Sequence, residues 1–297
     1  MSGIVAGYDG SDEAAAAVRW AAHQAFLRGT GLSVVHCSVW PAFTHDLGPV
    51  PGIADSGLQH AAEAVAAEGA AIAREEAPAV AVGTVLKFGW PAAVLKELSA
   101  DATMLVVGSR GIGGFMGLLV GSVSLELAAT ADCPVAVVRG TGSGPEGGPV
   151  VVGVDAEHAA SAADNRHWEE AVRKACVLAT LTESPLLIVS VQHRQGAWHR
   201  TPAPARPRRP EEVLDDAERT VRRWSPALDV RTRMLTGTSV AGTLLDAAHG
   251  ASAVVVGTHS RSVLSGSLGS TAHAVLHHAS CPVLVVRTAD APGGPVP

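Results

Sequence analysis

The sequence predicts an α/β protein made of two similar domains in tandem, each a parallel sheet with helices on both faces. Short valine-rich runs alternate with longer helical patterns, as in sheets that are covered on both sides. The chain also repeats itself, because Met104–Gly108 followed by Cys133–Arg139 is matched by Ala253–Gly257 followed by Cys281–Arg287. With 297 residues, of which 47% are hydrophobic, the chain is long enough for two domains.

In the first half, the turn and cap residues delimit the elements. Ser11 can cap a helix because its side chain accepts from free N–H groups, and Gly29 suits the end of that helix. Pro78 ends a later helix, and Pro91 suits the first position of the next one. We expect strands at 4–8, 32–39, 80–88, 104–107 and 135–138, and helices from 12, at 58–77, from 91 and at 125–131.

The second half predicts the same order of elements. Residues 140–149 are rich in Gly, Ser, Thr and Pro and cannot bury apolar surface, so they are expected to link a domain at 1–139 to a domain at 150–288. Residues 289–297 are then a flexible tail. We expect strands at 150–154, 186–191, 228–235 and 253–256, helices at 167–181, 211–224 and 239–248, and a last helix and strand after them.

Composition and charge exclude several classes of function. The formal net charge of −6 leaves no basic excess to attract nucleic acid or anionic lipid. The four cysteines are far apart and form no CxxC pair, which is typical of a reducing compartment. No apolar stretch reaches the roughly 18 residues of a membrane span, and the first residues do not read as a signal peptide. We therefore expect a soluble cytoplasmic protein.

The strand at 104–107 runs into a glycine-rich loop that precedes a helix. Glycines permit positive φ and the close approach of a ligand to bare backbone, and the free N–H groups and serine hydroxyls at a helix start favour phosphate. The loop therefore predicts a phosphate-binding site. Its residues are Gly108, Ser109, Arg110, Gly111, Ile112, Gly113 and Gly114, followed after six more residues by Gly121, Ser122, Val123 and Ser124.

This loop differs from the two commonest phosphate-binding motifs. No Gly-Lys-Ser/Thr follows its glycines, so it is not a Walker loop, and it follows the fourth strand instead of the first, so it is not a dinucleotide fingerprint. The spacing of Gly108, Gly111 and Gly121 instead resembles the G-x2-G-x9-G-[S/T] signature of ATP-binding universal stress proteins. Gly-Tyr-Asp-Gly-Ser at 7–11 and Cys-Pro-Val-Ala-Val-Val at 133–138 extend the resemblance over nearly all of the first half.

The resemblance implies a fold and a ligand. Each half would be a Rossmann-like, five-stranded parallel sheet of strand order 3-2-1-4-5, with a crevice where the order reverses. The ligand would be ATP, and a divalent cation such as Mg²⁺ could neutralise its phosphate oxygens. Gly108 to Gly114 and Gly121 to Ser124 would hold ribose and phosphates. The adenine and ribose end would be lined by Gly7, Tyr8, Asp9 and Cys37, although the family usually has an aliphatic residue at the position of Cys37.

The second half departs from the signature. Ser260 replaces the second glycine, and the segment from Ser260 to Gly269 is one residue shorter than in the first half. A side chain where positive φ is needed costs about 1 kcal/mol or more, and a shorter loop moves its N–H donors. We therefore expect ATP in the first domain only. The weaker candidates of the second domain are Gly153, Asp155, Gly257, Gly269 and Ser270.

Other interpretations of these residues remain open. The first loop could be a plain surface turn, and Asp9 could serve only to cap the following helix. The histidines show no metal-ligand spacing, and the arginine-rich stretch 206–210 is broken by prolines and is expected to be a solvated loop. Three functions follow: an ATP-binding module that regulates a stress response, a slow ATPase or phosphate- or adenylate-transferring enzyme, and a nucleotide-free scaffold. The absence of a recognisable general base favours binding over turnover. The two domains are expected to pair, with a homodimer as a further expectation.

Overall fold

The computed structural model describes residues 3–39, 57–112, 119–140, 147–156, 162–193, 209–258 and 268–287. The first half contains strands β1 (Ile4–Gly7), β2 (Leu32–Ser38), β3 (Val82–Phe88), β4 (Met104–Gly108) and β5 (Val135–Val138), and helices α1 (Asp12–Arg28), α2 (Gly57–Glu76), α3 (Pro91–Ser99) and α4 (Ser122–Thr130). The second half contains strands β6 (Val150–Gly153), β7 (Leu186–His193), β8 (Val230–Gly237), β9 (Ala253–Gly257) and β10 (Val283–Val286), and helices α5 (Ala162–Leu181), α6 (Pro210–Trp224), α7 (Val240–Ala247) and α8 (Ser270–His278).

Several sequence-based expectations lie outside these residues. They concern the centre of the first glycine loop, most of the linker, the shortened loop of the second half with its Ser260, the arginine-rich stretch and the tail: Gly113, Gly114, 141–146, 259–267, 206–208 and 289–297. Within the described ranges, no helix combines the length and the apolar character needed to cross a membrane.

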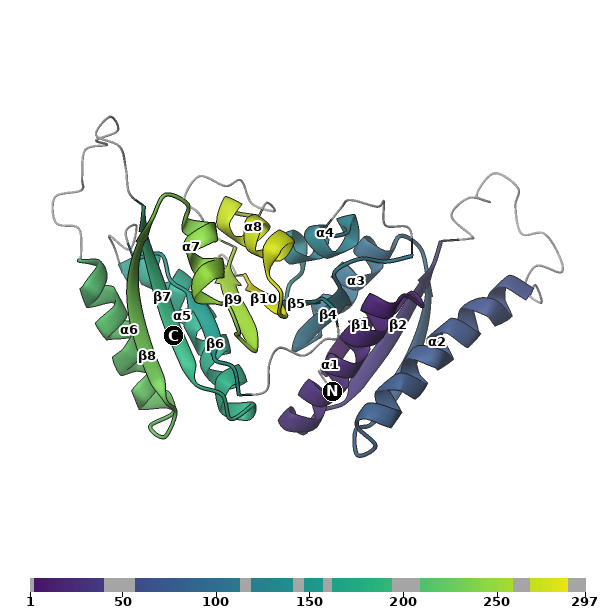
Figure 1. Cartoon of the computed structure of the whole chain (residues 1–297). Coiled ribbons are helices and arrows are strands. Elements are labelled where there is room, and N and C mark those ends of the chain that lie inside the picture. Colours follow the sequence, from purple (N-terminus) through teal and green to yellow (C-terminus); the bar gives the residue numbers. More distant parts are fainter. Residues whose placement is uncertain are drawn as a thin grey trace, which may run out of the picture.

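The strand order within each half is the expected one. The described strands form a single ten-stranded sheet in the order β3-β2-β1-β4-β5-β10-β9-β6-β7-β8 (Figure 1). All pairs are parallel except β5 with β10, where Val283 lies opposite Val137 and Val285 opposite Val135 in antiparallel register. The two domains were expected to pair, and they do so. The structure joins them through the backbones of their last strands into one sheet.

The ends of α1 show how local sequence sets an element. Ser11 precedes the helix in an extended conformation, and its side chain accepts a hydrogen bond from the Ala14 N–H. Gly29 ends the helix in the left-handed region, at a φ of 58°, which a glycine adopts without steric cost. Both predicted caps are confirmed.

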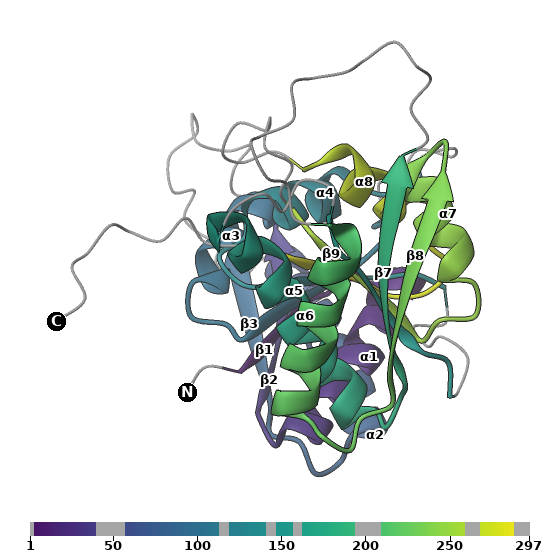
Figure 2. The ribbon, with the colours of Figure 1, turned by 90° about the vertical axis from the view of Figure 1, so that its left-hand side faces the viewer.

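Two apolar layers cover the sheet, and each is shared by both domains. One layer joins Ile4 and Ala6 of β1 to α1, α2, α5 and α6. The other contains Leu95 of α3, Leu127 of α4 and the matching leucines of α7 and α8. Figure 2 shows α5 and α6 side by side on one side of the sheet and α7 and α8 towards its other side. The two halves therefore share one interior on each face.

Some element ends differ from those expected. α5 begins at Ala162, earlier than the predicted 167, and β7 continues to His193, beyond the predicted 191. The longer strand pairs with β8 to its end, since Gln192 lies opposite Thr236 and His193 opposite Gly237. Ladder hydrogen bonds thus keep polar residues extended where the apolar pattern has already stopped.

Candidate functional site

The candidate site lies at the carboxyl ends of β1 and β4. These strands are neighbours in the sheet, with Ile4 opposite Met104 and Ala6 opposite Val106, yet their helices α1 and α4 belong to opposite apolar layers. A crevice forms at such a point because the two connections leave the sheet in opposite directions. Asp9 follows β1 into this crevice, and the glycine loop follows β4.

Asp9 ties the end of β1 to the glycine loop. Its Oδ1 accepts hydrogen bonds from the Ser11 N–H at 3.0 Å and from the Ser11 hydroxyl at 2.6 Å. Its Oδ2 accepts from the Ile112 N–H at 3.0 Å. Asp9 therefore does not cap α1 itself. It orients Ser11, which does, and it bonds a backbone N–H of the loop.

The glycines of the loop make room for protein atoms. A Cβ on Gly111 would lie 2.3 Å from Asp9 Oδ2, and a Cβ on Gly108 would lie 2.8 Å from the Glu13 carbonyl carbon in α1. The expectation of positive φ is wrong for the described loop glycines, which are absent from the residues with positive φ; Gly121 has a φ of −76°. Close packing against α1 and Asp9, and not an unusual backbone conformation, is what requires glycine at 108 and 111.

The start of α4 faces the same crevice. Gly121 is its N-cap, no side chain caps the helix, and the Gly121 N–H donates to the Ser109 carbonyl at 2.7 Å. The first N–H groups of a helix have no partner within it, so this end carries partial positive charge and favours an anion. Ser122, at the first helical position, is exposed.

The three serines of the signature differ in their surroundings. Ser124 is buried and its hydroxyl donates to the Gly108 carbonyl at 2.7 Å, so it braces the loop and does not face a phosphate, contrary to expectation. Ser109 is only 1% exposed, and among the described residues its hydroxyl has no hydrogen-bond partner. A buried hydroxyl without a partner costs about 1–3 kcal/mol.

The predicted adenine end is only partly as expected. The Tyr8 side chain is buried against Gly69 of α2, where a Cβ would lie 2.6 Å from Tyr8 Cδ1. Burial, followed by the nearby Glu68 carboxylate, raises the pKa of Tyr8 to about 12. Only the main chain of Tyr8 is left at the strand end, where its carbonyl accepts from His36 Nδ1 at 2.8 Å. His36 was not identified from the sequence, since nothing in its pattern indicates a bond to residue 8.

Gly7 and Cys37 lie on the other face, against α3. A Cβ on Gly7 would lie 3.1 Å from Leu95 Cδ1 and 3.3 Å from Val107 Cγ1, so glycine lets α3 pack closely. Cys37 is half-buried in the same apolar layer, and burial raises the pKa of its thiol to about 11. A neutral thiol in this position behaves as a small apolar group, which fits the aliphatic residue usual in the family.

Two further side chains border the crevice. Arg110 pairs with Glu13 of α1 at 2.6 Å, a contact that was not predicted from the sequence. Ile112 is 74% exposed, and a Cβ on Gly10 would lie 3.6 Å from its Cδ1 and 3.9 Å from Val65 Cγ1. An exposed apolar side chain beside a polar crevice is suited to contact a flat, apolar ligand face.

The second domain keeps part of this geometry. Gly269 is the N-cap of α8, with a φ of −63°, and its N–H donates to the Thr258 carbonyl at 3.3 Å. A Cβ on Gly153 would lie 2.9 Å from Leu244 Cδ2 in α7, so this glycine lets α7 pack closely, as Gly7 does for α3. For a Cβ on Gly257, the nearest atom among the described residues would be the Val286 carbonyl oxygen at 4.0 Å; the counterparts of Glu13 and Ala14 lie outside these residues. Ser270 and Asp155, the remaining candidates, are exposed.

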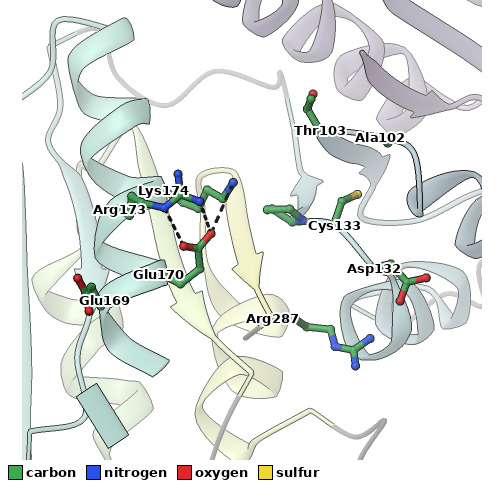
Figure 3. Close-up of a pocket in the computed structure, with 10 residues that line it drawn as sticks. Ala102, Thr103, Asp132, Cys133, Glu169, Glu170, Arg173, Lys174 and Arg287 are labelled. Atoms are coloured by element: carbon green, nitrogen blue, oxygen red, sulfur yellow. Dashed lines mark hydrogen bonds and ion pairs between the residues drawn. The ribbon is translucent and has the colours of Figure 1, made fainter. Parts of the chain in front are cut away.

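A separate cavity of about 610 Å³ lies between the domains, away from these residues (Figure 3). Glu170 of α5 pairs there with Arg173 at 2.6 Å and Lys174 at 3.6 Å. Burial opposes ionisation of Glu170, but the Arg173 hydrogen bond and the two cations keep its pKa below the usual range. The cavity was not predicted, since its walls come from both domains: Ala102, Thr103, Asp132, Cys133, Pro134, Glu169, Glu170, Arg173, Lys174 and Arg287.

Comparisons with known proteins agree with this architecture. The model of the universal stress protein family matches residues 1–139 and again residues 148–287. Universal stress proteins Rv2005c and Rv2624c of Mycobacterium tuberculosis are each 32% identical to this chain, covering 96% and 97% of it and 97% of their own lengths. The crystal structure of a universal stress protein from Archaeoglobus fulgidus superposes with a TM-score of 0.69 at 19% identity, covering 97% of both chains.

Proposed function

The chain belongs to the universal stress protein family, with two such domains in tandem, and from this we propose that its first domain binds ATP as a regulatory module of a stress response. The observation that carries the proposal is the convergence of three features at the ends of β1 and β4: the uncapped start of α4, the buried Ser109 hydroxyl with no partner among the described residues, and the Asp9 carboxylate bonded to the loop. Together they form a preorganised polar surface at a topological switch point.

The polar groups of the crevice fit the parts of a nucleotide. The first-turn N–H groups of α4 and the exposed Ser122 hydroxyl can donate to phosphate oxygens. Asp9 oxygens, which retain lone pairs beside their three bonds, can accept from ribose or from an adenine amino group. The exposed Ile112 side chain can cover one face of the base. Neutral, half-buried Cys37 leaves the base end apolar.

Mg²⁺ would enter this site with the phosphates. Within the described residues, no group of three or more His, Cys, Asp or Glu side chains could hold a metal ion. Magnesium generally binds through one or two carboxylates, water and substrate phosphates, so this donor set is compatible with the ion as a companion of ATP. Asp9 and Ser122 are the side chains here that can contribute oxygens.

Binding is proposed in preference to turnover. Arg110 is engaged by Glu13, and Asp9 is engaged by Ser11 and the loop, so the candidates for charge stabilisation and general base already have structural partners. A slow ATPase would instead need a free base within reach of the attacking water. The homodimer and the cytoplasmic location remain predictions.

The decisive experiment combines identification of the bound ligand with a matched pair of variants. Mass spectrometry of the small molecules released from freshly purified protein should detect an adenine nucleotide, and calorimetry with ATP, with and without Mg²⁺, should give one site per chain. Gly121→Val should weaken binding about a hundredfold, or about 2.7 kcal/mol, because its side chain fills the space in front of the α4 N–H groups. Among the described residues, a Cβ at this position meets no atom closer than 3.6 Å, so the variant should fold.

The control is Gly269→Val, at the equivalent N-cap of the second domain. It should leave the ATP affinity unchanged, because we propose that only the first domain binds. Wild-type protein that neither retains a nucleotide nor binds ATP in calorimetry would refute the proposal. Equal loss in both variants would instead assign a site to each domain.

A further inference from the structure

Arg139 connects the candidate site to the other domain. It is the first residue after β5, and its Nη2 donates to the Leu119 carbonyl at 2.8 Å and to the Leu276 carbonyl at 2.9 Å. Its Nη1 donates to the His277 carbonyl at 3.0 Å. Leu119 lies two residues before the α4 N-cap, whereas Leu276 and His277 form the last turn of α8 in the second domain. One guanidinium group therefore bonds the glycine loop and the second domain at once.

The chemistry of both partners suits an arginine. The last carbonyls of a helix lack intrahelical partners and carry partial negative charge, so a cation bonds them well. The planar fork of a guanidinium can serve several acceptors together, which a lysine ammonium cannot do in the same geometry. Figure 1 shows α4 and α8 on the two sides of the junction between β5 and β10. Arg139 directly follows β5 in the chain.

The charges near Arg139 indicate how a bound nucleotide would affect its hydrogen bonds. Partial burial, followed by the charge of Arg110, lowers the pKa of Arg139. The two guanidinium groups thus repel each other across the loop while Glu13 pairs with Arg110. A bound polyphosphate would add negative charge beside Arg110 and offset this repulsion, which strengthens the bonds of Arg139 to Leu119 and α8.

The second domain offers an internal comparison. Arg287 occupies the same position after the repeated Cys-Pro-Val segment, and its Nη1 donates to the Ala131 carbonyl at 3.0 Å, just beyond α4. Both arginines thus cross the seam between the domains. The counterpart of Leu119 in the second half is residue 267, which lies outside the described residues, so Arg287 serves as a control for contact across the seam.

We infer that Arg139 couples nucleotide occupancy of the first domain to the packing of α8 in the second domain. The inference rests on the proposed function. Because coupling between two sites is reciprocal, a nucleotide should tighten the last turn of α8, and loss of Arg139 should weaken nucleotide binding. Arg139 acts here as a positioning residue and need not touch the nucleotide.

The test uses full-length wild-type protein, Arg139→Met, Arg139→Lys and the control Arg287→Met. Calorimetry with ATP and Mg²⁺ gives affinities, and amide hydrogen exchange of residues 276–279 with and without ATP reports on α8. In wild type and Arg287→Met, ATP should slow exchange in α8. In Arg139→Met this effect should vanish and the ATP affinity should fall about tenfold. Arg139→Lys should keep the charge but lose the effect on α8, since it lacks the fork.

The outcomes separate the two proposals. If wild type does not bind ATP, the proposed function fails and the coupling fails with it. If wild type binds ATP but Arg139→Met shows the same affinity and the same slowing of exchange in α8, only the coupling is overturned. If ATP slows α8 exchange in Arg139→Met but not in Arg287→Met, the coupling runs through the other arginine and the assignment to Arg139 is wrong. Unfolding in urea checks that all variants are folded.

Discussion

The two domains share one strand order and yet differ at the end of their fourth strands. In the first domain Gly108 packs against the backbone of α1, Gly111 packs against Asp9, and Asp9 bonds the loop. In the second domain, the described atom nearest to a Cβ on Gly257 is the Val286 carbonyl oxygen at 4.0 Å, and the counterparts of Glu13 and Ala14 lie outside the described residues. The N-caps of α4 and α8 are nevertheless alike. Among the described residues, the two halves therefore share the start of this helix and differ in the contacts of the glycine that ends the fourth strand.

The largest effect should come from alanine at the two equivalent glycines. Gly108→Ala places a Cβ 2.8 Å from the α1 backbone, which cannot yield without moving the helix, so we expect a loss of about 3 kcal/mol in unfolding free energy. Among the described residues, the nearest neighbour of a Cβ on Gly257 is 4.0 Å away, so Gly257→Ala should change stability by no more than about 0.5 kcal/mol. Urea denaturation measures both, and equal losses would show that the packing difference is not real.

The next largest effect should come from ionisation of Tyr8 at alkaline pH. Tyr8 is the single tyrosine of the chain, and Val154 occupies the matching place in the second domain. Because the pKa of folded Tyr8 is raised to about 12 from 10.0, its contribution to stability is complete below pH 10.0 and is lost as the pH rises towards 12. Tyrosinate absorbance should therefore titrate near pH 12 in folded protein, and stability should fall over this range. Tyr8→Phe should remove the absorbance change and reduce the loss of stability; titration near pH 10.0 would contradict the burial of Tyr8.

A smaller effect should be the same in both domains. Gly7→Ala and Gly153→Ala each bring a Cβ to about 3 Å from the end of a leucine side chain, Leu95 in one case and Leu244 in the other. Such a side chain can turn away, so we expect losses of about 1 kcal/mol in both variants. Thermal unfolding of the two variants checks this. Clearly different stability losses would show that the two domains also differ at their first strands, β1 and β6.

The smallest effect should come from the ion pair beside the site. Glu13→Gln breaks the contact with Arg110, but because the Arg110 side chain is 48% exposed, solvent screening limits the stability loss to about 0.5 kcal/mol or less. The loss should shrink further at high salt. A larger, salt-independent loss in urea titrations at two ionic strengths would mean that the pair is more buried than its exposure indicates.

Much of this architecture could be predicted from local sequence. Ser11 and Gly29 are found as the caps of α1, and the Val-rich runs identify the strands, because these signals depend on near neighbours. The strand order within each half followed from the family resemblance.

Long-range contacts could not be predicted. The role of Gly108 depends on α1, and that of Tyr8 on α2, about 60 residues away. Similarly, Ser124 was expected to face a ligand, but the carbonyl to which it donates lies 16 positions earlier in the chain. His36, Arg139 and Arg287 have no local signature, because each bonds a main-chain carbonyl that only the folded sheet brings near.

The antiparallel junction of β5 with β10 has a consequence for how the two halves can diverge. Since both halves belong to one polypeptide, they are always made in equal amounts and meet without a search in solution. Mutations that abolish ligand binding in one half need not alter its last strand, β5 or β10. The other half therefore keeps its partner strand in the sheet. Covalent duplication thereby frees one copy from ligand recognition while preserving it as a permanent structural partner.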